Sequence, residues 1–486
     1  MTAPTPNATS AVPGGARIPG LPDPVVIRQL YLGCLSQASY LVGDRTSGRA
    51  IAVDPRRDVN ELLDAAAEEH LTIELIVETH FHADFLSGHL ELAEATGAAI
   101  AIGAAGTTEF QSRPLTDGEV IDLGTVSVEV WSTPGHTPES VSLVVRPAHG
   151  AEPAAVLTGD TLFIGDVGRP DLLVAADLPA EHLAEQLYDS IGRLAGLPDA
   201  TLVLPAHGAG SACGKALSSE TVSTIGEQRL SNYALAPMPK EQFVEIVTDG
   251  QPTAPGYFSY DAARNRQARE LMDERPLTPM DLASVDAATA DGAVVLDVRS
   301  TNDFAAGHLA GSLGITLDGR FAEQAGSLID PDSRIVLAGD TDAVEEARVR
   351  LARIGFDRVL GALTDVESTL AKFPGRARRL SRLSATDYIE RKHVLGEALV
   401  AIDVRNASEV SAAPVADARN IPLPLLRQQL MTLDPSQPTV VFCAGGARSA
   451  IASSLLLAAG FHDVSDVLGG ASALEEGSNA RRASRS

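Results

Sequence analysis

Short apolar runs alternate with amphipathic stretches between about residue 25 and residue 210 of the chain. The runs are rich in β-branched residues, which favour strands, whereas the stretch from Val59 to Glu69 spaces its Ala and Leu residues as a helix does. This alternation predicts α/β or layered αββα architecture. The runs end in His, Asp or Gly where strands would give way to loops, and α/β folds place their chemistry at such strand ends.

A tandem repeat occupies the rest of the chain. The segment from Leu277 to Ile315 matches the segment from Leu383 to Ile421, and in both copies an apolar strand ends in Asp-Val-Arg, at residues 297–299 and 403–405. Each copy alternates strand and helix over about 100 residues, which predicts a small parallel-sheet domain.

The chain of 486 residues is too long for one hydrophobic core, so we expect several domains. The first twenty residues are rich in Pro, Gly, Ser and Ala and lack the apolar stretch of a secretory signal, which predicts a flexible tail. The expected boundaries are a disordered tail (1–22), a first domain (23–250), a linker (251–275), two repeat domains (276–373 and 380–475) and a disordered C-terminal tail (476–486).

Charge, hydropathy and cysteine content narrow the range of functions. A net charge of −26 argues against nucleic-acid binding, and the short Arg-rich segments at 376–382 and 481–485 fit a solvated linker and tail. No apolar run reaches the ~18 residues that a membrane helix needs. Three cysteines, Cys34, Cys213 and Cys443, lie far apart without a CxxC pair, which fits a reducing compartment. We therefore expect a soluble cytoplasmic protein, with a homo-oligomer left open.

Four predicted strand ends of the first domain carry candidate metal ligands. Imidazole and carboxylate groups at strand ends are typical ligands of zinc or iron. The candidates are His80, His82 and Asp84 in the run THFHADFLSGH, His136 in TPGHT, Asp160 in LTGDTLF and His207 in LPAHG. Each is weak evidence alone, but the set together predicts a metal site.

The ordered set HxHxD, GH, GD and AHG resembles the metallo-β-lactamase superfamily over roughly residues 25–235. Hydrolytic members usually carry HxHxDH, whereas this chain has Phe85 in place of the last His. That His belongs to the second metal site, so its loss handicaps a dinuclear hydrolytic centre. His80, His136 and Asp160 remain as a two-histidine, one-carboxylate set, the composition of the facial triad in non-haem Fe(II) oxygenases.

The sequence looks like the persulfide dioxygenase branch of this superfamily, and the resemblance implies one Fe(II) per chain held by His80, His136 and Asp160. The other three candidate ligands are His82, Asp84 and His207. They either orient the ligands or bound waters, or remain from a two-metal site and now make structural hydrogen bonds.

The segment GDVGRPDL after Asp160 also resembles the family pattern. Within it, Arg169 and Asp171 are candidates for binding the carboxylate of a thiol carrier, although the two could instead pair with each other or with the backbone to hold the loop. Cys213, six residues after His207, either lies near the mouth of the site or is a buried structural cysteine.

The second repeat contains a cysteine at a predicted strand-to-helix turn, in the loop from Cys443 to Ser449 (CAGGARS). Glycines that let N–H groups point inward, and the positive end of the following helix, favour a thiolate nucleophile. Both repeats resemble rhodaneses, and the resemblance assigns the catalytic cysteine to Cys443, with Arg448 in its cradle. The first copy has Ala338 at the matching position, so it is expected to be an inactive structural or docking domain.

The combined resemblance implies that a thiol persulfide, carried by glutathione, coenzyme A or a similar thiol, is oxidised by O2 to sulfite. Cys443 would then pass a sulfane sulfur to sulfite and give thiosulfate. Two alternatives stay open: a thioester hydrolase of the hydroxyacylglutathione type, which needs two metals, and a persulfide carrier or sensor without oxygenase activity.

Overall fold

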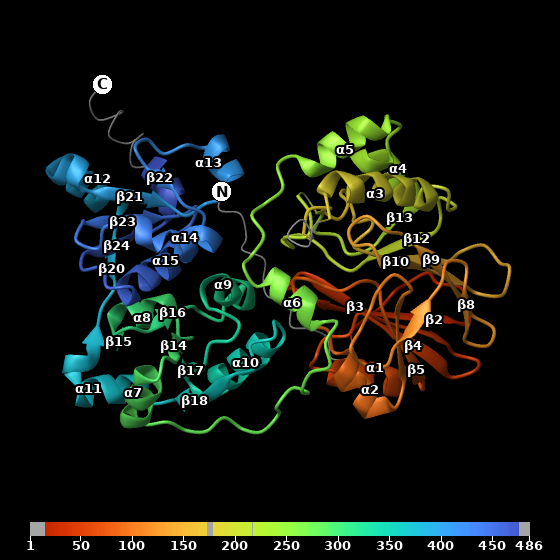
Figure 1. The fold of residues 1–486 in the computed structure, drawn as a ribbon, viewed down its shortest axis with the longest axis horizontal. Coiled ribbons are helices and arrows are strands. Elements are labelled where there is room, and N and C mark those ends of the chain that lie inside the picture. The colour runs from red at the N-terminus through yellow and green to blue at the C-terminus, as the bar shows by residue number, and fades with distance from the viewer. Residues whose placement is uncertain (1–14, 173–177, 216, 476–486) are drawn as a thin grey trace. The chain divides into compact units, whose positions relative to one another are not determined.

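The computed structural model describes residues 15–172, 178–215 and 217–475, drawn in colour in Figure 1. The chain divides into two compact units. The first comprises residues up to Met272 together with Ala352–Gly355, and the second comprises the rest.

Two mixed sheets form the centre of the first unit. One sheet follows chain order: β1 (Ala16–Arg17), β2 (Val25–Leu32), β3 (Gln37–Asp44), β4 (Arg49–Val53), β5 (Thr72–Glu78), β6 (Ala99–Gly103) and β7 (Arg113–Leu115). The other has the order β13 (Ser223–Thr224), β12 (Leu202–Pro205), β11 (Ala155–Gly159), β10 (Val141–Arg146), β9 (Ser127–Ser132) and β8 (Val120–Asp122).

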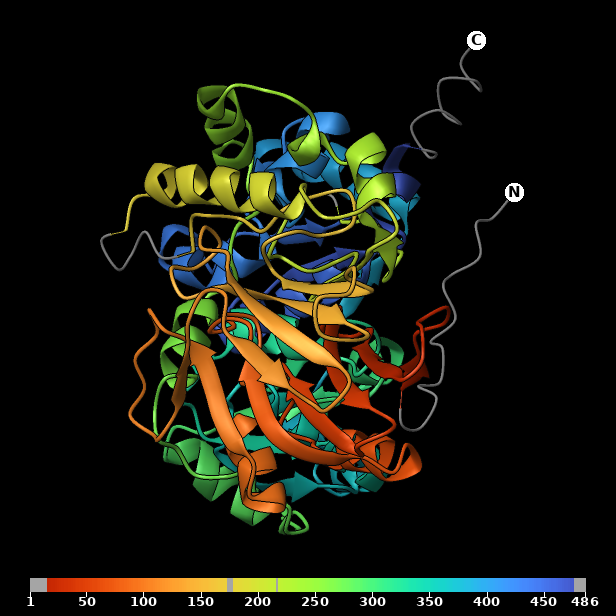
Figure 2. The ribbon, with the colours of Figure 1, turned by 90° about the vertical axis from the view of Figure 1, so that its right-hand side faces the viewer.

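Helices cover the outer face of each sheet. α1 (Asn60–Glu68) and α2 (His89–Thr96) lie on the first sheet, and α3 (Ala180–Leu194), α4 (Ile225–Ser231), η2 (Tyr233–Leu235) and α5 (Lys240–Thr248) lie on the second. Figure 2 shows α3, the long yellow helix, lying over the strands of the second sheet.

The core has three apolar layers because the long central strands, such as β3 and β10, bury side chains on both faces. Val42 and Leu143 pack between the sheets. Ile76 packs under α1 and α2, and Val156 packs under α3 and α5. The predicted αββα arrangement is confirmed.

Two segments expected to lack structure are ordered parts of the first unit. β1 pairs with β2 through Ala16↔Gln29 and Arg17↔Arg28, and Ile18 is 4% exposed, so the expected tail does not extend over these residues. The expected linker 251–275 contains α6 (Phe258–Arg264), which buries Phe258 and Asp261. Most of that segment therefore belongs to the first domain. The other tail residues, 1–14 and 476–486, lie outside the described residues.

The second unit holds the two repeats, each built on a parallel sheet. The first copy has the strand order β16 (Leu313–Gly314), β14 (Val294–Asp297), β17 (Ile335–Ala338) and β18 (Val359–Leu363). The second has β20 (Ser381–Leu383), β24 (Val464–Val467), β23 (Thr439–Phe442), β21 (Val400–Asp403) and β22 (Arg419–Asn420). The predicted parallel-sheet domains are confirmed.

Helices flank both sheets. In the first copy they are α7 (Leu282–Ala290), α8 (Thr301–Ala306), α9 (Phe321–Leu328), α10 (Thr341–Ala352), α11 (Val366–Lys372) and η3 (Pro374–Arg376). In the second they are α12 (Ala385–Leu395), η4 (Gly396–Ala398), α13 (Ala407–Ala412), α14 (Leu423–Gln429), η5 (Leu430–Thr432) and α15 (Ala447–Ala458).

The connection between the copies is also structured. β19 (Ala377–Arg378) pairs with β15 (His308–Leu309), so the gap expected between 373 and 380 contains a strand of the first copy. The copies touch through a small apolar contact of Phe304, Leu380 and Ala450.

Among the helices of the described residues, none has both the length and the apolar character that a bilayer crossing requires.

Candidate metal site and cysteine loop

The predicted metal ligands come together at one edge of the first domain. His80 follows β5, His136 follows β9, Asp160 follows β11 and His207 follows β12. β11 and β12 are parallel, and β9 runs in the same direction as β11 because both are antiparallel to β10. The carboxyl ends of these three strands therefore lie at the same edge, which explains why residues far apart in sequence meet.

His80, His136 and Asp160 form a compact buried triad. Asp160 Oδ2 lies 3.7 Å from His80 Nε2 and 3.5 Å from His136 Nε2, and each residue is 1% exposed. Within the described part of the chain, His80 Nε2 and Asp160 Oδ2 have no hydrogen-bond partner. Buried polar atoms without partners are costly, and here they converge at the spacing of metal ligands. The triad fits a metal ion.

Neighbouring groups fix which ring nitrogen faces the triad. His136 Nδ1 lies 2.8 Å from the carbonyl of Arg169, which can only accept, so Nδ1 carries the proton. The Thr79 hydroxyl donates to Asp54 (2.8 Å) and so accepts from His80 Nδ1 (3.0 Å). Both histidines consequently present an unprotonated Nε2 to the triad, as metal-ligating histidines do.

The electrostatics favour the same protonation states. Burial, followed by the nearby His82, lowers the pKa of His80 well below its ordinary value. Burial opposes ionisation of Asp160, but His207 and His80 outweigh it and hold the pKa of that carboxyl below normal. The triad thus offers a neutral His80 and an anionic carboxylate near neutral pH.

His207 bridges two carboxylates beside the triad. Its Nδ1 lies 2.7 Å from Asp160 Oδ1 and its Nε2 lies 2.7 Å from Asp84 Oδ2. Burial opposes its protonation, but Asp160 and Asp84 outweigh burial and raise the pKa of His207 well above its ordinary value. His82, Asp84 and His207 also lie within ligand range of one another, while the Phe85 ring packs against His82 with centroids 4.3 Å apart.

The cysteine loop of the second repeat has the expected strand-to-helix geometry. Cys443 follows β23 and is 2% exposed, and the N–H of Gly446 donates to its Sγ at 3.1 Å. Gly446 has φ +104°, a conformation that glycine adopts without strain and that turns this N–H inward. Both terminal nitrogens of Arg448 donate to Glu409 at 2.7 Å, so the guanidinium is held beside the loop.

Comparisons with known proteins agree with this architecture. The family model of the metallo-beta-lactamase superfamily matches residues 32–207, and the rhodanese-like domain model matches residues 281–363 and 385–476. Persulfide dioxygenase ETHE1, mitochondrial, from Bos taurus is 30% identical over 227 residues, which is 46% of this chain and 81% of that protein. The chain belongs to the persulfide dioxygenase branch of the metallo-β-lactamase superfamily, with two rhodanese-like domains fused to it.

Two further similarities extend the comparison. The solved structure of a metallo-beta-lactamase from Staphylococcus aureus subsp. aureus COL superposes with a TM-score of 0.64 and 32% identity, covering 70% of this chain and 99% of that one. Hydroxyacylglutathione hydrolase from Methylococcus capsulatus is 34% identical over 171 residues, 35% of this chain and 60% of that protein.

Hydrogen bonds to three other residues hold the side chain of Arg169. Its guanidinium forms a bidentate pair with Asp171 (2.6 and 2.7 Å) and donates to the carbonyls of Ala212 and Pro252 (3.1 and 2.8 Å). This geometry favours the loop-holding alternative over substrate binding for both residues.

Cys213 is fully buried beside the metal site. It lies within ligand range of Asp160 and His207, and burial, together with the charges of Asp84 and Asp160, raises the pKa of its thiol well above the ordinary value. A thiol held in its protonated form is a poor nucleophile, so the structural alternative is favoured here as well.

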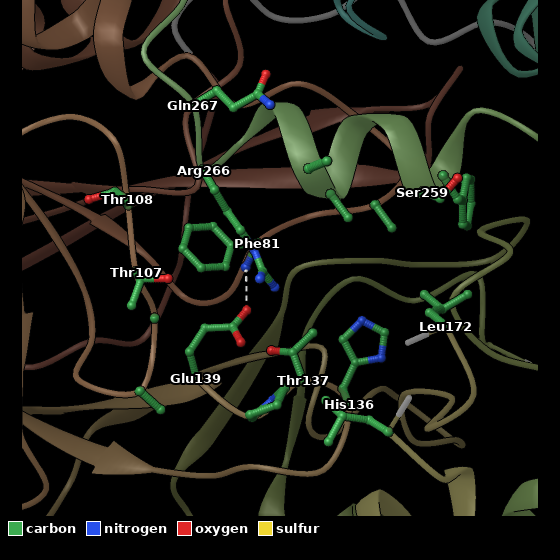
Figure 3. A pocket seen from close by; sticks show the side chains of 18 of the residues that line it. Phe81, Thr107, Thr108, His136, Thr137, Glu139, Leu172, Ser259, Arg266 and Gln267 are labelled. Atoms are coloured by element: carbon green, nitrogen blue, oxygen red, sulfur yellow. Dashed lines mark hydrogen bonds between the residues drawn. The ribbon is translucent and has the colours of Figure 1, made fainter. Parts of the chain in front are cut away.

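A cavity of about 710 Å³ opens onto the triad through His136 (Figure 3). Arg266, which follows α6, reaches into it and lies over the ring of Phe81, 4.6 Å from the centroid. The Phe81 N–H donates to Glu139 at 3.0 Å on the same wall. Arg266 was not among the candidates from the sequence, because it lies in the expected linker. The helix before it, α6, has only seven residues and shows no clear periodic pattern.

The first rhodanese-like copy lacks a cysteine at the matching strand end. Ala338 is the last residue of β17 and is 1% exposed. A methyl group at this place cannot form a persulfide, so we still expect this copy to be inactive in sulfur transfer.

Proposed function

We propose that this chain oxidises a low-molecular-weight thiol persulfide with O2 at one Fe(II) and transfers sulfane sulfur at Cys443. One observation carries the proposal: two histidine nitrogens and one carboxylate oxygen converge in a buried triad whose orientation is already fixed by neighbours. This ligand composition with open positions is typical of non-haem iron oxygenases.

Iron bound there would supply the redox chemistry that joins sulfur to O2. The residues of the chain supply the ligand atoms and the buried environment. His80 and His136 contribute neutral nitrogens, and Asp160 contributes a negative charge that partly balances the cation. The burial of all three limits the access of bulk water.

The overall reaction balances without any further reductant. A persulfide RSSH, one O2 and one H2O give RSH, sulfite and two protons. The S–S bond breaks, the outer sulfur gains three oxygens, and O2 takes up the four electrons that this sulfur loses. The carrier thiol is released for another cycle.

The cavity beside His136 is where we place the thiol carrier. Phe81 supplies an apolar wall, while Arg266, Gln267 and Thr107 supply polar groups (Figure 3). A guanidinium in a partly buried pocket favours a carboxylate or phosphate, which glutathione and coenzyme A both carry. Arg266 is therefore our candidate for the group that recognises the carrier.

In the rhodanese half-reaction, we assign Cys443 as the nucleophile. Its thiolate takes the outer sulfur from a persulfide, and attack by sulfite on that sulfur forms thiosulfate and regenerates the thiolate. The Gly446 N–H would stabilise negative charge on sulfur, and Arg448, positioned by Glu409, would attract the sulfite dianion.

A thioester hydrolase is the second candidate, because His82, Asp84 and His207 still form a cluster of metal-ligand type. Phe85 weakens that reading, since it places an apolar ring where the hydrolytic members carry a further ligand. A persulfide carrier without oxygenase activity is the third candidate.

Anaerobic loading of the full chain with Fe(II), followed by substrate assays, separates these readings. We expect one iron per chain in the triad, O2 uptake with glutathione persulfide or coenzyme A persulfide, and no hydrolysis of a glutathione thioester. Thioester hydrolysis with two zinc ions per chain would support the hydrolase. Iron-loaded protein that consumes no O2 with either persulfide would overturn the dioxygenase proposal.

A further inference from the structure

Behind His80 lies another buried cluster of ligand-type side chains, formed by Asp54, Glu78 and His82. All three are at most 1% exposed, and their donor atoms lie within 4.8 Å of one another. None of the three is among the residues that line the cavity in Figure 3. The dioxygenase and rhodanese reactions proposed above leave this cluster without a role.

The spacing within the cluster matches that of ligands around one metal ion. His82 Nε2 lies 3.1 Å from Asp54 Oδ1 and 3.6 Å from Glu78 Oε2. With metal–ligand bonds of about 2.1 Å, neighbouring donors in tetrahedral or octahedral sites are roughly 3.0 to 3.5 Å apart. The cluster is thus about as compact as the candidate iron triad.

Several atoms that face the centre of this cluster are unpartnered. Considering only the described residues, Glu78 Oε2 and both ring nitrogens of His82 make no hydrogen bond, although Nε2 is close to Asp54. Close approach without hydrogen-bond alignment is what a shared cation produces. His82 is 0% exposed, so its ring nitrogens are shielded from bulk solvent.

Other groups hold the carboxylates of Asp54 and Glu78 in place, and one of their contacts is to Asp54 Oδ1, the oxygen nearest His82. Thr79 donates its N–H and its hydroxyl to the two oxygens of Asp54 at 2.7 and 2.8 Å. His89 Nδ1 lies 3.1 Å from Glu78 Oε1, which leaves Oε2 directed at His82. Such outer contacts orient ligands in metal sites.

A cation would also relieve the charge of the two buried carboxylates. In the described structure, the ion pairs of Asp54 and Glu78 involve only histidines, with no Lys or Arg in direct contact. Two buried carboxylates without a cation are strongly unfavourable, because desolvation and mutual repulsion act together.

We propose that Asp54, Glu78 and His82 bind a divalent transition-metal cation, separate from the iron of the His80 triad. The mixed nitrogen and oxygen ligands suit Zn²⁺ or Mn²⁺ better than Mg²⁺ or Ca²⁺. The cation neutralises the two carboxylates and holds the run that carries His80. It is not needed to accept electrons, so its role is structural.

His82 also lies within ligand range of Asp84 and His207, so a second metal ion could instead use that cluster. Variants distinguish the two sites. Glu78→Gln and Asp54→Asn remove a charge from the proposed site with little change of shape, whereas Asp84→Asn does the same in the competing one.

The test counts metals and does not depend on turnover. The iron-loaded full chain is dialysed against Zn²⁺ under anaerobic conditions, and both metals are measured by mass spectrometry. We expect one equivalent of zinc in addition to iron in the native chain and in Asp84→Asn. Glu78→Gln and Asp54→Asn should bind that zinc at least tenfold more weakly, with unchanged far-ultraviolet circular dichroism.

His136→Ala serves as the matched control for the iron site. It should lose iron and keep the additional zinc, so the outcome for this cluster is separate from the outcome for the dioxygenase. Equal zinc content in native, Glu78→Gln and Asp54→Asn protein would overturn the proposal. Loss of the zinc in Asp84→Asn alone, or no zinc bound by the native chain, would overturn it as well.

Discussion

Asn265 donates a hydrogen bond from its side-chain amide to the carbonyl of His82 at 2.8 Å, across 183 positions of sequence. The same nitrogen donates to the carbonyl of Phe85 at 2.9 Å, and the amide oxygen accepts from the N–H of Ser87 at 2.8 Å. One side chain just after α6 therefore satisfies three backbone groups in the loop that follows His80.

Replacing Asn265 by Ala should loosen this loop. Three buried backbone groups would lose their partner, and at roughly 1 kcal/mol or more for each we expect a loss of about 3 kcal/mol in the free energy of unfolding. Iron affinity should fall with it, because the loop directly follows His80. Urea unfolding and iron titration measure the two effects, with the exposed Asn60→Ala as control. Unchanged stability and iron affinity would contradict the structural role.

Arg266 should affect the KM for the persulfide more than the kcat. Because its guanidinium lies in the cavity and contacts no member of the triad in the described structure, Arg266→Met should raise KM for an anionic persulfide about tenfold or more. The value of kcat should change little. Arg264→Met is a matched control, since Arg264 lies over Tyr260 outside the cavity. A fall in kcat with unchanged KM would contradict this assignment.

Glu91 predicts a pH dependence of stability in the first unit. Burial opposes ionisation of its carboxyl, but Arg269 and Arg57 outweigh burial and lower its pKa to about 2. A lowered carboxyl pKa stabilises the fold fully above its ordinary value of 4.5, and this stabilisation is lost as the pH falls toward 2. The shift corresponds to about 3 kcal/mol.

Comparison of the native chain with Glu91→Gln isolates this effect. The difference in the free energy of unfolding between them should stay constant from pH 7 to pH 5. It should shrink as the pH is lowered below about 4.5, because the carboxyl of the unfolded chain then takes up a proton while the folded carboxylate stays ionised until the pH nears 2. Urea unfolding at each pH, with the exposed Glu94→Gln as a second reference, provides the measurement. A difference that is constant down to pH 3 would contradict the assignment.

The sequence was sufficient to predict the layered first domain, the two parallel-sheet repeats and the meeting of His80, His136 and Asp160. Each of these ligands follows an apolar strand, and β9 and β11, which precede His136 and Asp160, run in the same direction and bring their carboxyl ends to one edge of their sheet. His80 follows β5 of the other sheet, and the family resemblance assigned it to the set. Cys443 was predictable for a similar reason, since a strand, a glycine-rich turn and an apolar helix adjoin it.

Other features depend on long-range contacts that no local pattern reveals. β1 has only two residues and depends on its pairing with β2, and α6 has only seven residues, which follow a stretch that contains Pro252, Pro255 and Gly256. The alternatives for Arg169 differed only in which atoms it contacts, and a sequence pattern does not carry that information. The contacts of Asn265 and Arg266 could not be predicted for the same reason.

We propose that two separate sites act on sulfur, the His80 triad with O2 and Cys443 with sulfite. The most direct measurement follows O2 uptake and products with glutathione persulfide in the iron-loaded native chain, His136→Ala and Cys443→Ser. We predict that His136→Ala abolishes uptake, and that Cys443→Ser keeps it while the product shifts from thiosulfate to sulfite. Uptake that survives in His136→Ala, or an unchanged thiosulfate yield in Cys443→Ser, would contradict the account.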